Sequence, residues 1–450
     1  MPRFAIPNLS LSMLLLAAAA GLPGCASDAD VAVDPAKLTP PQPNEITGRY
    51  IAIVCDGDLS ATGDAPMTGK QPDMLTIVPL PFPSPDQMRK YSFPFKQVEV
   101  CNSSYGPPTA LAVSPNGQTV YIVESCKIGP DGGPDDDSGG DCLYAVTING
   151  PTDASVSAKR RVGMRPISVN VNPQGDYLAI VTAEPGKQLV IVKSVGGTLG
   201  EALPFELPGV ADAKAEVGGV VWDPMGRYLA VTLPKQNKVM FYEFTRDSGS
   251  GMPSLRKWGE PVTAGQTCTS GVFTPDGRFF LTANLHQVEQ TAGFNVMPPE
   301  GSVSLIELAA GPKDVHELVG QTGVGVMPES IAISPDGQYV VTANVRRSWR
   351  DDGEMAAAKT AGSLSLISVN EKDAKLTTLG EFDLKALPKG VSFDASGKNV
   401  VVAQYRSFDA GAVDSELAFF KLVPGPKACL VPGQWFAGIG TGAHGVVIAK

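Results

Sequence analysis

Charged and polar residues stand at one recurring place in the chain, and their types suit acid–base catalysis. Counted from a turn motif that recurs along the sequence, this place is occupied by Arg165, Glu216, Thr269, Glu329, Lys389 and His444. A carboxylate or an imidazole can take a proton from water, and a nearby cation can stabilise a negatively charged oxygen. Glu329 and His444 are therefore candidate general bases. Arg165 and Lys389 are candidate oxyanion partners, with simple pairing of opposite charges as the alternative.

The elements that must position these residues come from a repeated turn. In most copies a proline stands two residues before a glycine, and a β-branched or aromatic run follows, as in SPDGQYVVTA from Ser334. Proline presets the second position of a tight turn and glycine favours its fourth, so each copy predicts the corner between two strands. The copies recur every 51 to 60 residues, with glycines at Gly117, Gly175, Gly226, Gly277, Gly337 and Gly397.

The two ends of the chain supply a seventh copy. The last residues, HGVVIAK from His444, align with KGVSFDA from Lys389, and TGRYIAIV from Thr47 continues where they stop. Each copy also carries a third hydrophobic strand and a weaker fourth one, such as QVEV at Gln97. Four antiparallel strands per repeat predict an all-β, seven-bladed β-propeller over 47–450, whose last blade is closed by both termini. The candidate catalytic residues would then converge on the mouth of the central channel.

The repeat is also similar to a known one. SPDG-x-Tyr-Val-Val-Thr-Ala-Asn is complete at 334–344 and nearly so at 274–284, and it resembles the YVTN repeat of seven-bladed propellers. That family is similar to the seven-bladed lactonases, such as 6-phosphogluconolactonase, and to exported propellers with no assigned reaction. The resemblance covers 47–450 and implies the fold. The shared residues belong to turns and strands, so the resemblance assigns no catalytic residue.

The amino terminus has the pattern of an export signal. Arg3 precedes an apolar stretch over 9–20, which is too short to span a bilayer, and the sequence LPGC follows, ending at Cys25. This sequence resembles the bacterial lipobox, whose cysteine is lipidated, and the alanine after it is typical of lipoproteins sent to the outer membrane. We expect a signal peptide over 1–24, a lipidated Cys25 with a disordered tether over 25–46, and a monomer anchored in the cell envelope, facing the periplasm or the exterior. A plain secretory signal is the alternative.

The remaining six cysteines are an even number, which in an oxidising compartment predicts disulfides. The expected fold narrows the connectivity. Cys126 and Cys142 flank one loop of a single blade, and Cys55 and Cys101 fall at the same end of two strands of the closing blade. Cys268 and Cys429 are then left to pair.

The loop between Cys126 and Cys142 is rich in glycine and in carboxylates. The acidic residues are Asp131, Asp135, Asp136, Asp137 and Asp141. Several oxygen ligands on a flexible loop suit calcium, so the loop is a candidate calcium site, with a solvated acidic loop as the alternative. The sequence has no zinc-type spacing of histidines, no P-loop and no Rossmann glycine pattern, so it points to no required cofactor.

Two long connections, after LTANL and after VTANV, are expected side by side on one face of the propeller. Basic and aromatic residues that suit a protein partner occur in the second connection and in the next repeat: Arg346, Arg347, Trp349, Arg350, Tyr405 and Arg406. The net charge of −10 argues against nucleic acid. The function we expect is an extracytoplasmic, lipid-anchored binding or scaffolding protein for a protein or envelope partner. A lactonase-type hydrolase at the channel mouth is the alternative, and a subunit of a periplasmic dehydrogenase is a third class.

Overall fold

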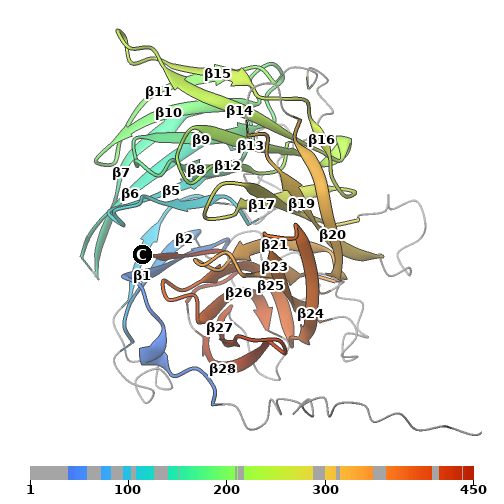
Figure 1. Ribbon diagram of the computed structural model, residues 1–450. Coiled ribbons are helices and arrows are strands. Elements are labelled where there is room, and N and C mark those ends of the chain that lie inside the picture. The colour runs from blue at the N-terminus through green and yellow to red at the C-terminus, as the bar shows by residue number, and fades with distance from the viewer. Residues whose placement is uncertain are drawn as a thin grey trace, which may run out of the picture.

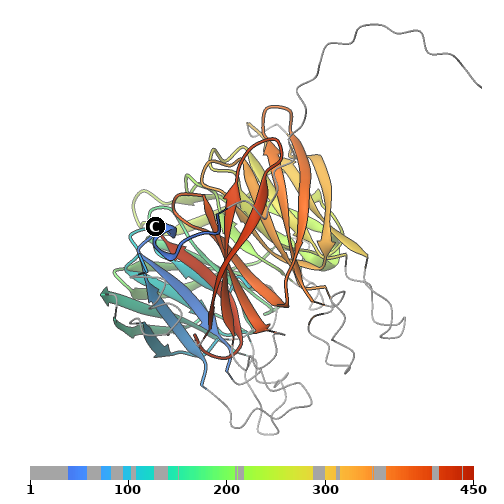
Figure 2. The same ribbon diagram turned by 90° about the horizontal axis from the view of Figure 1, so that it is seen from below.

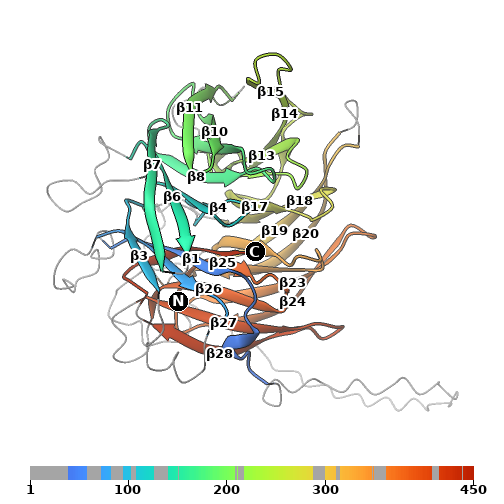
Figure 3. The same cartoon turned by 90° about the vertical axis from the view of Figure 1, so that its left-hand side faces the viewer.

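A computed structural model describes residues 39–57, 72–82, 95–102, 108–125, 140–150, 152–207, 210, 217–286, 299–310, 315–346, 348, 361–407, 415–437 and 439–450. Their strands form seven antiparallel sheets that follow one another around a common axis (Figures 1, 2 and 3). The predicted seven-bladed β-propeller is therefore confirmed. No helix in this described part of the chain is long and apolar enough to cross a membrane.

Each sheet forms one blade, and its strands run in order from the axis outward. The first three blades consist of β29 (Ala443–Ala449), β1 (Tyr50–Cys55), β2 (Met74–Pro79) and β3 (Lys96–Glu99); β4 (Leu111–Val113), β5 (Thr119–Val123), β6 (Cys142–Gly150) and β7 (Asp153–Arg161); and β8 (Pro166–Val171), β9 (Tyr177–Thr182), β10 (Leu189–Val195) and β11 (Thr198–Phe205).

The fourth blade differs from the others because two separate strands, β15 and β16, pair with its third strand. The last four blades consist of β12 (Val220–Trp222), β13 (Tyr228–Leu233), β14 (Lys238–Arg246), β15 (Pro253–Lys257) and β16 (Val262–Thr263); β17 (Cys268–Phe273), β18 (Phe279–Asn284), β19 (Glu300–Glu307) and β20 (Glu317–Val326); β21 (Pro328–Ile333), β22 (Tyr339–Asn344), β23 (Ser363–Asn370) and β24 (Lys375–Asp383); and β25 (Ala386–Phe393), β26 (Asn399–Ser407), β27 (Glu416–Val423) and β28 (Cys429–Ala437).

The repeated turn joins the first and second strands of a blade, as its composition predicts. In blade 6 the amide of Gly337 donates to the carbonyl of Ser334 at 2.9 Å, and Gly337 has a φ of 75° that favours glycine. The Ser334 hydroxyl accepts the amide of Tyr339 at 3.0 Å, which starts β22. All six residues of β22 are buried, because neighbouring blades cover both faces of the strand.

The two ends of the chain close the ring. β29 pairs antiparallel with β1, so the carboxyl terminus lies beside the amino-terminal strand (Figure 1). Thr47 donates from its amide and its hydroxyl to Asp394 at 3.0 and 2.8 Å, which ties the chain before β1 to blade 7. Ile46 and Pro43 are also buried, so the last part of the expected tether packs on the propeller.

The core lies between adjacent blades. Blades 6 and 7, for example, share a cluster that contains Val341, Leu366 and Val402. Each such side chain contributes about 1.5–3 kcal/mol by leaving water. Near the axis, backbone amides of one inner strand donate to serines of the preceding blade, as Val391 does to Ser330 at 3.2 Å. These contacts fix the relative heights of the inner strands.

Candidate functional site

A β-bulge marks the start of the inner strand in several blades. In blade 6, Pro328 pairs with Asn344 and Ser330 pairs with Ala343, so Glu329 is one extra residue on its strand. Bulges re-aim a side chain and occur often beside active sites. The same irregularity places extra residues at Ile167, Thr269 and His444, and it falls between Pro388 and Val391 around Lys389.

These positions define a ring around the channel mouth. Six of them stand eight residues before a turn glycine, as 329 does before 337, and consecutive inner strands contact one another all the way round. We call this set the mouth ring, and it consists of Thr109, Ile167, Gly218, Thr269, Glu329, Lys389 and His444. Four of the polar members, from Thr269 to His444, occupy consecutive blades.

One of the expected ring residues, Arg165, has another place, and a second one, Glu216, is not described. Arg165 stands two residues before Ile167, has a φ of 50°, and its amide donates to the carbonyl of Gly140 at 2.7 Å. The register of β8 therefore puts Ile167 at the ring position that we had expected for Arg165. Glu216 lies outside the described residues, and Gly218 takes the corresponding position.

Glu329 and Lys389 form an ion pair across two inner strands. The Lys389 Nζ atom donates to Glu329 Oε2 at 2.7 Å, and the two side chains are 14 % and 15 % exposed. Pairing of opposite charges is the alternative to a catalytic role at these positions, and Glu329 and Lys389 do form such a pair. Both side chains keep some exposure, so the ion pair is not fully sealed from solvent.

His444 is buried and held by Asn102. Its Nε2 atom lies 2.8 Å from Asn102 Oδ1, while Asn102 Nδ2 donates to the carbonyls of Cys55 and Val100, each at 3.1 Å. Since the amide nitrogen has these two acceptors, its oxygen must accept, and His444 therefore carries its proton on Nε2. Burial, helped by the charge of Lys389, lowers the pKa of His444 to about 3. The imidazole is neutral at ordinary pH.

Of the predicted partner-binding residues, Arg346 follows β22, the second strand of blade 6, and Tyr405 and Arg406 lie near the end of β26, the second strand of blade 7. Arg346 donates to Glu381 and Asp383, each at 2.7 Å, so two carboxylates of β24 bind its guanidinium. Tyr405 packs against a buried apolar cluster that contains Leu285, Met327, Val345 and Leu387. Arg406 lies in β26. Arg347, Trp349 and Arg350 lie outside the described residues.

The cysteines are free thiols at Cys55, Cys101, Cys142, Cys268 and Cys429. The expected Cys55–Cys101 bond is not formed, because β2 separates β1 from β3, and two strand spacings of about 4.8 Å exceed the reach of a disulfide. The expected Cys268–Cys429 bond is not formed either, because β17 and β28 lie in blades that a third blade separates.

The candidate calcium loop is described only at its end. The Sγ of Cys142 donates to Asp141 Oδ1 at 2.8 Å, and Asp141 Oδ2 binds Arg161 at 2.7 Å. Cys126 and the other four aspartates, Asp131, Asp135, Asp136 and Asp137, lie outside the described residues, as does Cys25. Among the residues that are described, no three imidazole, thiol or carboxylate groups gather closely enough to hold a metal ion.

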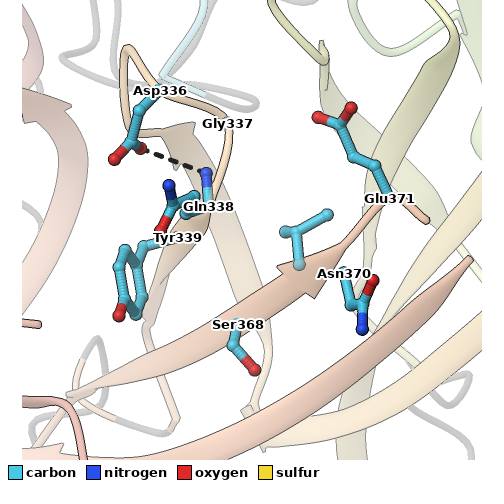
Figure 4. Close-up of a pocket in the computed structure, with 8 residues that line it drawn as sticks. Asp336, Gly337, Gln338, Tyr339, Ser368, Asn370 and Glu371 are labelled. Carbon is cyan, nitrogen blue, oxygen red and sulfur yellow. Dashed lines mark hydrogen bonds between the residues drawn. The ribbon is translucent and has the colours of Figure 1, made fainter. Parts of the chain in front are cut away.

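A hollow of about 460 Å³ lies at the other end of blade 6, beside the tight turn (Figure 4). Its walls include Asp336, which accepts the amide of Gln338 at 3.1 Å, and Glu371 at the turn after β23. Burial and the neighbouring charge of Asp276 raise the pKa of Glu371. Sequence reasoning missed this hollow, because its residues were assigned to turn formation alone.

Comparisons with known proteins agree with the geometry. A family model described as "Lactonase, 7-bladed beta-propeller" matches residues 95–416. No curated protein matches the chain. The chain is similar in fold to a periplasmic gluconolactonase from Pseudomonas aeruginosa, with 15 % identity, a TM-score of 0.58, and coverage of 89 % of this chain and 99 % of that one.

Two further solved structures show the same fold. A candidate 6-phosphogluconolactonase from Bacteroides fragilis has 16 % identity and a TM-score of 0.60, with 89 % of this chain and 98 % of that one covered. A functionally unknown protein from Desulfotomaculum acetoxidans has 15 % identity and a TM-score of 0.57, with 89 % and 99 % covered. At these identities the likeness concerns the fold alone.

Proposed function

The chain belongs to the lactonase family of seven-bladed β-propellers, and on that premise we propose that it hydrolyses a lactone at the channel mouth. The observation that carries this proposal is the Glu329–Lys389 pair, which joins a base and a cation at neighbouring ring positions. Both groups can accelerate lactone hydrolysis, because water must lose a proton as it attacks and the carbonyl oxygen gains negative charge.

The reaction can be written with these two side chains. The carboxylate of Glu329 takes a proton from water while the water oxygen attacks the lactone carbonyl carbon. The ammonium of Lys389 stabilises the resulting oxyanion. As the tetrahedral intermediate collapses, the ring C–O bond breaks and the Glu329 carboxylic acid returns its proton to the leaving oxygen. The product is the open hydroxy acid, and the enzyme regains its starting charges.

His444 is not the general base in this proposal, although the sequence made it a candidate for that role. A base whose conjugate acid has a pKa of about 3 accepts a proton from water poorly at neutral pH, because catalytic bases work best with a pKa near the operating pH. His444 is also buried with its Nε2 atom held by Asn102, whereas Glu329 keeps some exposure, so Glu329 is the general base in this proposal. His444 remains a neutral neighbour of Lys389.

Titration of released acid at constant pH, over a panel of lactones, tests the proposal. Glu329→Gln should lower kcat by about 10²–10⁴, the usual worth of a general base. Asp336→Asn is a matched control, because it also replaces a carboxylate by an amide, but at the opposite end of the same blade. The wild-type chain opening none of the lactones, or Glu329→Gln leaving the rate unchanged, would contradict the proposal.

Use of the loop-bearing face by a protein or envelope partner stays a second proposal. The apolar cluster beneath that face, with Tyr405 partly buried against it, is the observation in its favour. Retention of an envelope protein by the wild-type chain, and its loss with Arg406→Ala and Tyr405→Ala, would support it. Asp336→Asn, at the opposite end of blade 6, is the control, and equal retention by Asp336→Asn and by these two variants would contradict the proposal.

Export and lipid anchoring at Cys25 are likewise proposals, supported by the signal sequence. Cys25→Ser should move the protein from the membrane fraction to the soluble fraction. Calcium binding by the acidic loop is a fourth proposal, for which calorimetric titration is the test. An absence of heat at millimolar calcium would contradict it.

A further inference from the structure

The charges of the mouth ring limit the kind of lactone that fits it. Four ring residues carry no charge: Thr109, Ile167, Gly218 and Thr269. The remaining three are Glu329, Lys389 and His444. Whether the ring attracts anions therefore depends on the charge states of these three side chains.

Glu329 and Lys389 cancel each other. Their contact of 2.7 Å joins one carboxylate to one ammonium, so the pair has no net charge. The nearby Arg346 adds no surplus of positive charge, because Glu381 and Asp383 both bind it at 2.7 Å. Sites that bind phosphate groups usually offer unpaired cations, often arginines that donate two parallel hydrogen bonds.

His444 cannot supply the missing cation. The hydrogen bonds of Asn102 fix the proton of His444 on Nε2, and no hydrogen bond from Nδ1 to any described residue stabilises a second proton. Adding that proton would place a positive charge in a buried site near Lys389, which explains why the pKa falls to about 3. The net charge of the ring is therefore zero at neutral pH.

We propose that the mouth ring takes an uncharged lactone and discriminates against lactones that carry a phosphate. This inference rests on the proposed lactone hydrolysis and names the substrate class for the same site. A phosphorylated ligand would leave a dianion beside Glu329 with no unpaired cation in the ring, and the net charge of −10 on the chain would also oppose its approach.

The test compares gluconolactone with 6-phosphogluconolactone, which differ by the phosphate. With the full purified chain, kcat/KM should be at least roughly tenfold higher for gluconolactone, and calorimetry should show tighter binding of gluconate than of 6-phosphogluconate. Preference for the phosphorylated lactone, or equal rates, would overturn the inference. If neither lactone is opened, the proposed function fails, and the two binding measurements still decide the charge preference.

A gain of positive charge gives a second test. Ile167 is a half-buried ring residue with no part in the proposed chemistry, and a lysine there can extend its ammonium toward solvent. Ile167→Lys should shift the ratio of the two kcat/KM values toward the phosphorylated lactone by roughly tenfold. Ile167→Met, of similar length without charge, should leave the ratio unchanged. An equal ratio in both variants would overturn the inference, and the wild-type comparison stands if the lysine variant does not fold.

Discussion

The buried neutral state of His444 makes a quantitative prediction about stability. In the unfolded chain a histidine has a pKa near 6.5, whereas burial lowers the pKa of His444 in the folded protein to about 3. Below pH ~6.5 the His444 imidazole binds a proton in the unfolded state but not in the folded state, so acid favours unfolding. The stability contributed by the neutral imidazole is complete above pH ~6.5 and is lost as the pH falls toward the folded value.

The size of the effect follows from linkage. The loss begins below pH ~6.5, and each pH unit from there costs about 1.4 kcal/mol for one proton. Between pH ~7.5 and pH ~4.5 only about the last two units count, so the free energy of unfolding should fall by roughly 3 kcal/mol because of His444. His444→Gln removes the titrating group, and the amide of the glutamine can still donate toward Asn102.

Urea unfolding of both proteins at the two pH values measures the effect. The wild-type chain should lose roughly 3 kcal/mol more than His444→Gln over this range, because all other titrating groups are shared and cancel in the difference. Equal losses in the two proteins would contradict the lowered pKa of folded His444, since they would mean that His444 takes up its proton as readily when folded as when unfolded. A larger loss in the variant would refute it as well.

Three further predictions concern the Glu329–Lys389 ion pair, the cysteine thiols and the strand β29 that closes the ring. Lys389→Met should lower the free energy of unfolding by about 2–4 kcal/mol, because it leaves the mostly buried carboxylate of Glu329 unpaired; an unchanged denaturation midpoint would contradict this. In the native protein an alkylating reagent should modify the exposed Cys101 before the buried Cys268, because burial raises the pKa of Cys268 to about 12. Mass spectrometry of the modified peptides gives the order, and earlier modification of Cys268 would contradict its burial. Deleting 443–450 should remove the strand that pairs with β1 and abolish cooperative unfolding, whereas an unchanged melting transition would show that the ring does not need this strand.

The fold could be predicted because its signals are local and repeated. A turn such as Ser334 to Gly337 specifies its own geometry through proline, serine and glycine, and the β-branched run after it can form only a buried strand. The closure of the ring was also predictable, because the end of the chain stops where a turn glycine is due and Gly48 supplies that glycine.

The site was predictable only in part. Glu329, Lys389 and His444 were identified because equal spacing from the turn reflects equal height on the inner strand. Arg165 does not belong to the ring, because it stands ten residues before Gly175, whereas Glu329 stands eight before Gly337; the exact spacing and the register of β8 both place Ile167 there.

The partners of buried groups were beyond sequence reasoning for a related reason. The two carboxylates that bind Arg346 come from the region of the fourth strand, 35 residues along the chain for Glu381, and only the folded blade brings them together. Asn102 reaches His444 across the seam between the two ends of the chain. The disulfide predictions failed for Cys55 and Cys101 because two strands of one blade can share an end and still be separated by the strand between them.

We propose that the Glu329–Lys389 ion pair at the channel mouth opens lactones, and one rate comparison tests this role. The most direct measurement is the initial rate of acid release from gluconolactone, at constant pH, by the wild-type chain, by Glu329→Gln and by Asp336→Asn. We expect hydrolysis above the spontaneous rate for the wild type and for Asp336→Asn, and a rate reduced by about 10²–10⁴ for Glu329→Gln. Hydrolysis by all three proteins at the same rate would contradict it, and so would a wild-type rate no faster than the spontaneous one.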